Sequence, residues 1–192
     1  VYDFLCWGDG TLLVANKTSL EAFDPDTLES LGSVEGTFGP YCPAQYHDGV
    51  LACGGWLYRY ENGAFTPLGG PGAQETFNWS SGVFLGDYYY LAGQNTLYAV
   101  NTETGEVAEA FVFDAARKTN NQGGTVYDAD TGRLYWATSY ASQNLYSLAV
   151  NSDGTLDEQS LKAVDVGQDT VSTPVLWNSR VYVAGQKGMV SV

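Results

Sequence analysis

The stretch that decides the fold is Asn78-Trp-Ser-Ser-Gly-Val-Phe-Leu-Gly-Asp-Tyr-Tyr-Tyr-Leu-Ala-Gly-Gln-Asn-Thr-Leu-Tyr-Ala-Val-Asn-Thr-Glu-Thr-Gly-Glu-Val107. Its apolar, tyrosine-rich segments are short, and turn-forming residues separate them at Gly86-Asp87, Gln94-Asn95 and Thr102-Glu-Thr-Gly105. Short β-rich runs bounded by glycine, asparagine and aspartate are typical of hairpins. The stretch therefore predicts three short antiparallel strands and the start of a fourth.

The same pattern returns along the chain, so the stretch is one unit of a repeat. The positions Pro43, Ser81, Gly124 and Pro174 recur at spacings of 38, 43 and 50 residues. Propeller blades of four strands repeat every ~40–50 residues, whereas leucine-rich, ankyrin and tetratricopeptide repeats are shorter. The sequence therefore predicts an all-β fold, a β-propeller of four-stranded antiparallel blades with almost no helix. An immunoglobulin-like sandwich is the alternative, but it explains only the short strands and not the repeat.

The repeat predicts about four and a half blades in a single domain, a partial β-propeller covering residues 1–192. The approximate blade boundaries are 1–36, 37–72, 73–118, 119–168 and 169–192, and the last blade is incomplete. Propellers usually close with four to eight blades, which favours a fragment of a larger propeller. We expect the remainder of the propeller or a second copy at the open end, since exposed strand edges promote association.

Four segments carry a resemblance to a known family. Thr96-Leu-Tyr-Ala-Val-Asn-Thr-Glu-Thr-Gly-Glu106 resembles the blade signature of the pyrroloquinoline-quinone-type, or quinoprotein-like, β-propellers. Related forms begin at Ser19 and Asn144, and the segment from Ser172 to Gly185 resembles the inner two strands of such a blade. Family enzymes such as alcohol and glucose dehydrogenases hold a quinone over a tryptophan near calcium ligands, and many carry an adjacent-cysteine disulfide. This chain has no Cys-Cys pair and no matching aspartate motif, so we expect the non-enzymatic branch and no cofactor.

Charge and hydropathy limit the partners. The chain has 22 acidic and 8 basic residues, a formal net charge of -14. Such a field disfavours nucleic acid and anionic membrane surfaces, and no apolar run of ~18 residues predicts membrane insertion. The chain starts at Val1 rather than methionine, which predicts a mature or trimmed product. A secreted or cell-surface bacterial protein is the expected source.

The cysteines allow two interpretations. Cys42 and Cys53 flank the turn His47-Asp-Gly49, so a hairpin brings them close together across neighbouring strands. A cross-strand disulfide is strained, and the sequence favours buried free thiols over that bond.

The acidic residues are better explained by turns than by chemistry. Aspartate supports turn backbones through side-chain hydrogen bonds, which explains Asp24, Asp26, Glu103, Asp128, Asp130 and Asp153. The segments 128–132 and 151–155 resemble half a calcium loop but lack the glutamate at the twelfth position, so we assign no metal site. The lone histidine, His47, lies in a hairpin turn, and no Gly-x-Ser-x-Gly elbow accompanies it. A glycosidase with paired carboxylates is not excluded by composition.

Geometry predicts a binding site better than any motif does. The first strand of each propeller blade lines the axis, so the residues just before these strands gather at one mouth of the channel. They are Tyr41, Asn78, Trp79, Asn121, Gln122, Thr170 and Ser172. Their aromatic and amide side chains suit carbohydrate, peptide or other polar ligands, or alternatively they pack the axis. The remaining tryptophans, Trp7, Trp56, Trp136 and Trp177, are expected to pack on the sheets.

The sequence therefore predicts a non-catalytic binding module for a protein or carbohydrate ligand, with no assigned catalytic residue. Two alternatives stay open. One is a fragment of a quinone-dependent dehydrogenase or of a hydrolase. The other is an envelope assembly scaffold similar to the propeller lipoproteins of outer-membrane barrel assembly, which would carry a lipidated N-terminal cysteine.

Overall fold

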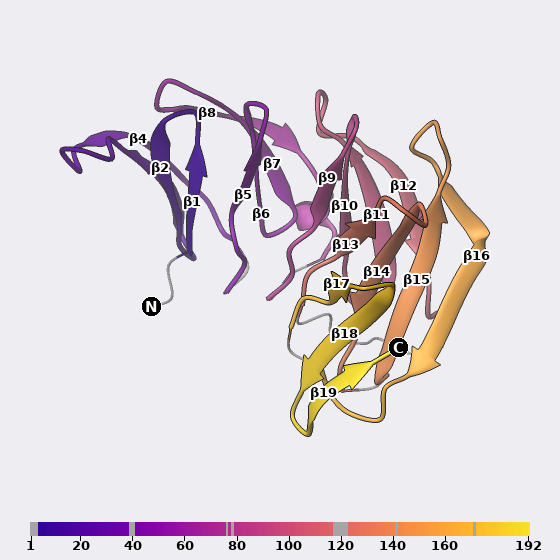
Figure 1. Ribbon diagram of the computed structural model, residues 1–192. Helices are drawn as coiled ribbons and strands as arrows, with labels where there is room; N and C mark the ends of the chain where they lie inside the picture. The colour runs from indigo at the N-terminus through magenta and orange to yellow at the C-terminus, as the bar shows by residue number, and fades with distance from the viewer. Residues whose placement is uncertain are drawn as a thin grey trace.

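The computed structural model describes residues 4–38, 41–75, 77, 79–116, 123–140, 142–170 and 172–192. They form five antiparallel sheets arranged in an arc, each built from consecutive strands (Figure 1). We call these sheets blades 1 to 5 in chain order. The all-β propeller architecture predicted from the repeat is thus confirmed, with four blades of four strands and one of three.

The strands of the first three blades are short. Blade 1 contains β1 (Phe4–Gly8), β2 (Thr11–Ala15), β3 (Ser19–Phe23) and β4 (Ser30–Glu35). Blade 2 contains β5 (Gln45–His47), β6 (Val50–Cys53), β7 (Trp56–Glu61) and β8 (Ala64–Gly69). Blade 3 contains β9 (Val83–Leu85), β10 (Tyr88–Ala92), β11 (Thr96–Asn101) and β12 (Val107–Val112).

The last two blades follow the same order. Blade 4 contains β13 (Val126–Asp128), β14 (Arg133–Ala137), β15 (Asn144–Val150) and β16 (Leu156–Asp165), and blade 5 contains β17 (Val175–Trp177), β18 (Arg180–Gly185) and β19 (Gly188–Ser191). The one helical element in the described residues is the 3-10 turn η1 (Pro71–Ala73). None of the described helical structure is long and apolar enough to cross a membrane.

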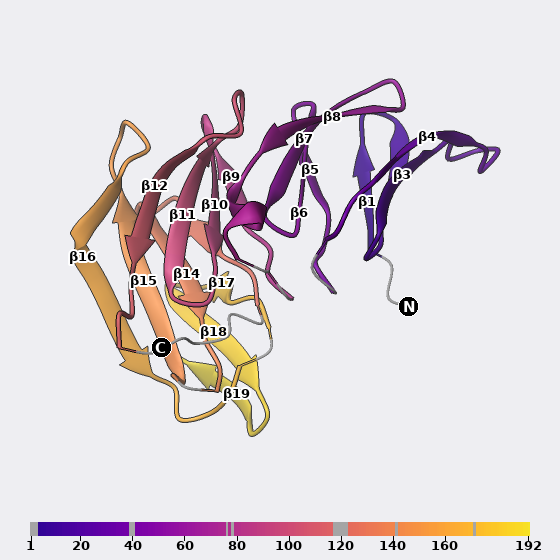
Figure 2. The ribbon, with the colours of Figure 1, turned by 180° about the vertical axis from the view of Figure 1, so that it is seen from behind.

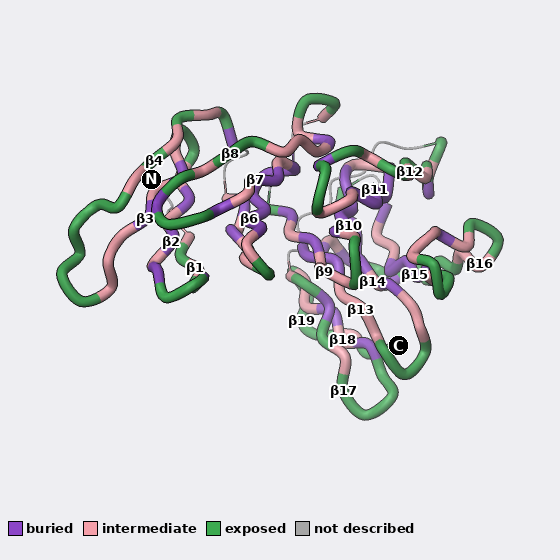
Figure 3. Tube along the Cα trace, turned by 90° about the horizontal axis from the view of Figure 1, so that it is seen from above, coloured by how far each residue is buried: buried purple, intermediate pink, exposed green. Residues whose placement is uncertain are grey.

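Neighbouring blades meet along both their inner and their outer strands. The inner strand β1 lies beside β5 and β9 lies beside β13, while the outer strand β4 lies beside β8 and β12 beside β16. Figure 2 shows the outer strands along the rim of the arc, and Figure 3 shows the buried residues gathered between the sheets. The first strand of each blade therefore faces the axis, as the repeat predicts.

Alternation within each strand gives every blade two packing faces. In β2, Leu13 and Ala15 are fully buried against blade 2, while the alternating residues Leu12 and Val14 are only half-buried on the opposite face. We call the side toward the next blade in sequence the following face, and the other side the preceding face. The largest fully buried side chain, Trp136, lies between blades 3 and 4.

A register shift recurs between the third and fourth strands of every four-stranded blade. In blades 1 to 3 the outer strand carries one extra residue, Leu31, Leu68 or Ala108. An extra residue on one strand is a β-bulge, which bends the strand and interrupts the ladder. The three paired strands of blade 5 show no such shift.

The inner strands are shorter than expected. The pattern predicts a strand over Tyr41–Tyr46, but β5 begins at Gln45, because Tyr41 has a left-handed backbone with φ 67°. Measured from the starts of the inner strands, the blade 5 counterpart of Pro43, Ser81 and Gly124 is Thr173 rather than Pro174.

Candidate binding site at the channel mouth

Strand direction sorts the connections onto two ends of the molecule. Because consecutive strands are antiparallel, the links between blades leave the sheets at the same end as the links between second and third strands. We call this end, which lies at the bottom of Figure 1, the mouth end. The turns that join first to second and third to fourth strands lie at the other end, which we call the turn end.

The mouth end carries a stacked aromatic pair. The rings of Tyr41 and Trp79 lie 3.9 Å apart between centroids and are inclined by 17°. Each residue stands four positions before the inner strand of its blade, β5 or β9. The sequence prediction placed both residues at the mouth, and the structure brings them into contact from blades 2 and 3.

Both residues of the pair adopt a backbone that side chains disfavour. Their φ angles are 67° and 65°, and a bulky residue at positive φ is uncommon. Such a conformation costs ~1–3 kcal/mol per residue and persists only where the surroundings enforce it. The repeat of this conformation in two successive blades shows that the fold directs both rings to the same place.

Cys42 fixes the two loops that carry the pair. Its thiol donates to the carbonyl oxygen of Phe77 at 2.7 Å, and its sulfur also faces the backbone amides of Ser80 and Trp79. Burial raises the pKa of the Cys42 thiol to about 11, so at neutral pH it keeps the proton that it donates. All three cysteines are free, in agreement with the buried-thiol interpretation.

The other predicted mouth residues in the described chain hold the backbone together. Thr170 is buried, and its hydroxyl donates to the carbonyl oxygen of Thr138 at 3.0 Å. The Ser172 hydroxyl accepts from the amide of Ala184 and donates to its carbonyl oxygen, both at 3.1 Å. These two residues therefore shape the mouth of blades 4 and 5 rather than offering free polar groups. Asn78, Asn121 and Gln122 lie outside the described residues.

Tyr140 is a mouth residue that the sequence reasoning missed. It lies in the link between β14 and β15, is exposed, and has a φ of 66° like the stacked pair. Its amide donates to the carboxylate of Asp169 at 2.6 Å, and that same oxygen accepts from the Gln143 side chain at 3.2 Å. The signal in the sequence was the length of this link, because the equivalent links in blades 1 to 3 are shorter.

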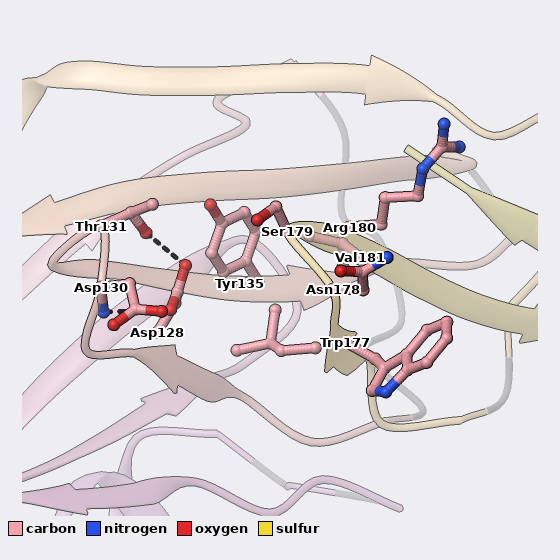
Figure 4. Close-up of a pocket in the computed structure, with 10 residues that line it drawn as sticks. Asp128, Asp130, Thr131, Tyr135, Trp177, Asn178, Ser179, Arg180 and Val181 are labelled. Carbon is pink, nitrogen blue, oxygen red and sulfur yellow. Dashed lines mark hydrogen bonds between the residues drawn. The ribbon is translucent and has the colours of Figure 1, made fainter.

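The turn end contains grooves between blades, one of which lies between blades 4 and 5 (Figure 4). This groove encloses about 260 Å³, with Tyr135 and Trp177 among its lining residues. Its carboxylate at Asp128 accepts from the Thr131 hydroxyl at 2.6 Å and from the Asp130 amide at 3.2 Å. This acid therefore supports its own turn, as the sequence predicted.

Acidic charge is concentrated at the turn end. Its links contain no basic residue, and their acids are Asp9, Asp24, Asp26, Glu29, Asp48, Asp87, Glu103, Glu106, Asp130 and Asp153. The described links of the mouth end carry both signs of charge, from Lys17, Glu75, Asp114, Asp169 and Lys187. The stacked pair thus lies at the less charged end of a strongly acidic molecule.

Comparison with known proteins supports the fold. No protein-family model and no curated protein matches the chain. Among solved structures, BamB from Moraxella catarrhalis has a TM-score of 0.69 at 12% identity, covering 95% of this chain and 57% of that chain. A chain of the mitotic checkpoint complex has a TM-score of 0.71 at 11% identity, with coverages of 97% and 61%. The WD40 β-propeller domain of Doa1 has a TM-score of 0.65 at 8% identity, with coverages of 97% and 61%.

These identities are too low to carry more than architecture. The chain spans 57% to 61% of the length of the first two solved structures that it matches. Its blades superpose on theirs over nearly its whole length. The chain therefore has a β-propeller fold.

Proposed function

We propose that this chain is a non-catalytic binding module of the quinoprotein-like β-propeller type, which engages a protein or glycan ligand at its mouth end. The observation that supports this proposal most is the Tyr41–Trp79 stack on two left-handed backbones. Backbone strain concentrates at ligand clamps and similar functional sites, and a rigid aromatic surface binds sugar rings or peptide side chains at low entropic cost.

The exposure of the pair also supports this proposal. The Trp79 side chain remains 44% exposed although it stacks on Tyr41, so part of the indole is available to a ligand. The lower charge of the mouth end suits a neutral polar ligand. Polar loops at the same end of the molecule, including the link that carries the exposed Tyr140, provide the hydrogen-bonding groups that orient such ligands.

The position of the chain's only histidine argues against the alternative function, a hydrolase. His47 lies at the turn end, with its Nε2 3.5 Å from Asp48 and its ring stacked on Phe84. It is therefore remote from the mouth, and the acids near it belong to hairpin turns. A binding module uses the mouth without requiring any of these groups.

The test is binding of the 192-residue chain to a glycan array and a synthetic peptide array, followed by Trp79→Ala on any ligand found. We expect at least about tenfold weaker binding, because loss of ~1.4 kcal/mol of ring contact corresponds to a tenfold change in Kd. Trp177→Ala is the matched control, because it removes an exposed indole from the turn end. Circular dichroism checks that each variant folds.

Two outcomes would contradict the proposal. Unchanged affinity of Trp79→Ala for every ligand would show that the mouth does not bind them. An equal loss of affinity in Trp177→Ala would point to a nonspecific aromatic effect. Whichever array gives the Trp79-dependent signal identifies the ligand as protein or glycan.

The cellular location is a second part of the proposal. The acidic surface and the mouth suited to polar ligands favour a secreted or cell-surface bacterial protein. Protease treatment of intact cells that express the natural protein tests this: digestion without lysis is expected, and protection until lysis would contradict it.

A further inference from the structure

One contact rule holds at the first two junctions between blades. The middle residue of the short inner strand, on the preceding face, packs on the last residue of the inner strand before it. Tyr46 packs so closely on Gly8 that a Cβ there would enter the ring. Phe84 stacks on His47 with ring centroids 5.3 Å apart.

At the two later junctions the corresponding residues lie in one cluster or line one groove. Tyr127 of blade 4 shares a hydrophobic cluster with Leu85 of blade 3. Leu176 of blade 5 lines the groove in Figure 4 together with Asp128 of blade 4. A preceding face thus presents a large side chain, and a following face accepts it.

Blade 1 presents this large side chain without a partner among the described residues. Trp7 pairs with Leu12 one step before the hairpin turn, as Tyr46 pairs with Leu51 in blade 2. It therefore occupies the same position, yet its side chain is 62% exposed. Leu5, on the same face, is also exposed. The expectation that Trp7 packs on a sheet is wrong within the chain.

Blade 5 presents the complementary face, and no other blade in the described part of the chain covers it. Trp177 ends its inner strand, in the position that Gly8 and His47 occupy in blades 1 and 2. It is 67% exposed, and Met189 on the same face is 70% exposed. These two residues line an apolar hollow of about 350 Å³ with Val175 and Tyr182.

We propose that a second copy of this chain fills both vacancies, with blade 5 of one copy packing on blade 1 of the next. Trp7 of the second copy takes the role that Tyr46 and Phe84 have inside the chain, and it packs on Trp177. The two faces carry the contact rule that joins the blades of this chain. A second copy supplies the complementary face for each, which is why we propose it as the occupant.

The contact is head to tail, so it has two physical consequences. A heterologous contact of this kind leaves one free face at each end of a dimer, so association continues beyond two copies unless a ring closes. Each copy carries a net charge of -14, so like charges oppose the contact. Screening by salt weakens that repulsion, and association is expected to increase between 20 and 500 mM NaCl.

The experiment is sedimentation velocity of the 192-residue chain over a concentration series, with the variants Trp7→Ser and Trp177→Ser. We expect concentration-dependent oligomers of the natural sequence and about tenfold or greater weakening in each variant, as for a tryptophan at the centre of an interface. An equimolar mixture of the two variants is expected to form dimers, because it unites the intact Trp177 face of one with the intact Trp7 face of the other. Trp79→Ser, which lies on neither face, is the control and should associate normally.

Three results would overturn the proposal. They are a monomer at all concentrations, a Trp7→Ser variant that associates as well as the natural sequence, and a mixture of the two variants that stays monomeric. Normal association of Trp7→Ser with loss in Trp177→Ser would identify a symmetric contact between two copies of blade 5. Circular dichroism of the variants separates a lost interface from a lost fold.

Discussion

The two ends of this molecule are built from the same kind of short connection but reach their structure by different routes. The turn end depends on local chemistry. The Oδ1 atom of Asp24 accepts from the amides of Asp26 and Thr27 at 2.9 and 2.8 Å. In blade 3 the side-chain oxygen of Asn101 accepts from the same two positions of its turn, at 3.0 and 2.9 Å.

The mouth end depends on contacts between distant parts of the chain. Tyr41 stacks on Trp79, Cys42 bonds to Phe77, and Thr170 bonds to Thr138. No local rule produces these pairs, since each joins different connections. A turn whose glycine meets no neighbour, such as the turn at Gly132, thus tolerates replacement by any sequence with the same turn chemistry, whereas the loops that carry Tyr41 and Trp79 tolerate only what fits their neighbours.

The test with the largest expected change in stability replaces one glycine at each end. Gly55, at the mouth end, has φ 81°, and a Cβ there would enter the ring of Phe77. Gly132, at the turn end, has φ 67°, and a Cβ would meet nothing within 4 Å. We expect Gly55→Ala to lower the free energy of unfolding by about 3 kcal/mol or more, and Gly132→Ala by about 1–2 kcal/mol.

Urea denaturation followed by tryptophan fluorescence measures both changes. The two variants share the same backbone strain, so their difference isolates the packing at the mouth. Equal losses of unfolding free energy in the two variants would contradict the difference in packing between the two ends.

The second test uses pH. Burial raises the pKa of Cys42 from 9.0 to about 11, so the folded state holds the thiol proton more tightly than the unfolded chain does. The stabilisation is complete below pH 9 and is lost as the pH rises toward 11. At pH 10.5 the loss is about 2 kcal/mol from this thiol.

Urea midpoints between pH 7.5 and 10.5 measure this slope, and Cys42→Ala should reduce it. The stability contributed by the turn end changes at acidic rather than alkaline pH. Backbone hydrogen bonds from Thr27 and Asp26 lower the pKa of Asp24 below 3.8, so its contribution is present above that pH and lost as the pH falls. A slope at alkaline pH that is the same with and without Cys42 would contradict the assignment.

The smallest test concerns one strained turn. Leu28 has φ 58° and donates its amide to the carbonyl oxygen of Asp24. Gly105 has φ 74° and makes the equivalent bond to Asn101 in blade 3. We expect Leu28→Gly to stabilise the chain by about 1 kcal/mol, because glycine adopts this conformation without steric cost. A lower melting temperature of this variant would show that the exposed Leu28 side chain contributes contacts that offset the strain.

The same difference explains how much could be predicted. Hairpin turns such as Asp48-Gly49 and Asn62-Gly63 have positive φ at both central residues, and this turn chemistry is visible in the sequence. Because turns set the strands and the repeat sets the blades, the fold followed from local patterns. The mouth was located by topology alone, which identified Tyr41 and Trp79 but not their contact.

Other features of the mouth depend on side-chain placement that no repeat encodes. Thr170 was predicted to bind a ligand, but its hydroxyl donates to a backbone carbonyl. Tyr140 lies in a link that is longer in blade 4 than in blades 1 to 3. The exposure of the Trp7 and Trp177 indoles likewise could not be predicted from the repeat, because it depends on what packs against each face.

The bulges in the outer strands determine where this acidic molecule is safe from aggregation. Strands β4, β8 and β12 each present a row of backbone groups at the rim, a template on which cross-β fibrils grow. The extra residues Leu31, Leu68 and Ala108 interrupt each row and bend its strand. The backbone geometry of the rim therefore opposes edge-to-edge pairing in addition to charge, and this part of the protection should persist at ionic strengths that screen the carboxylates.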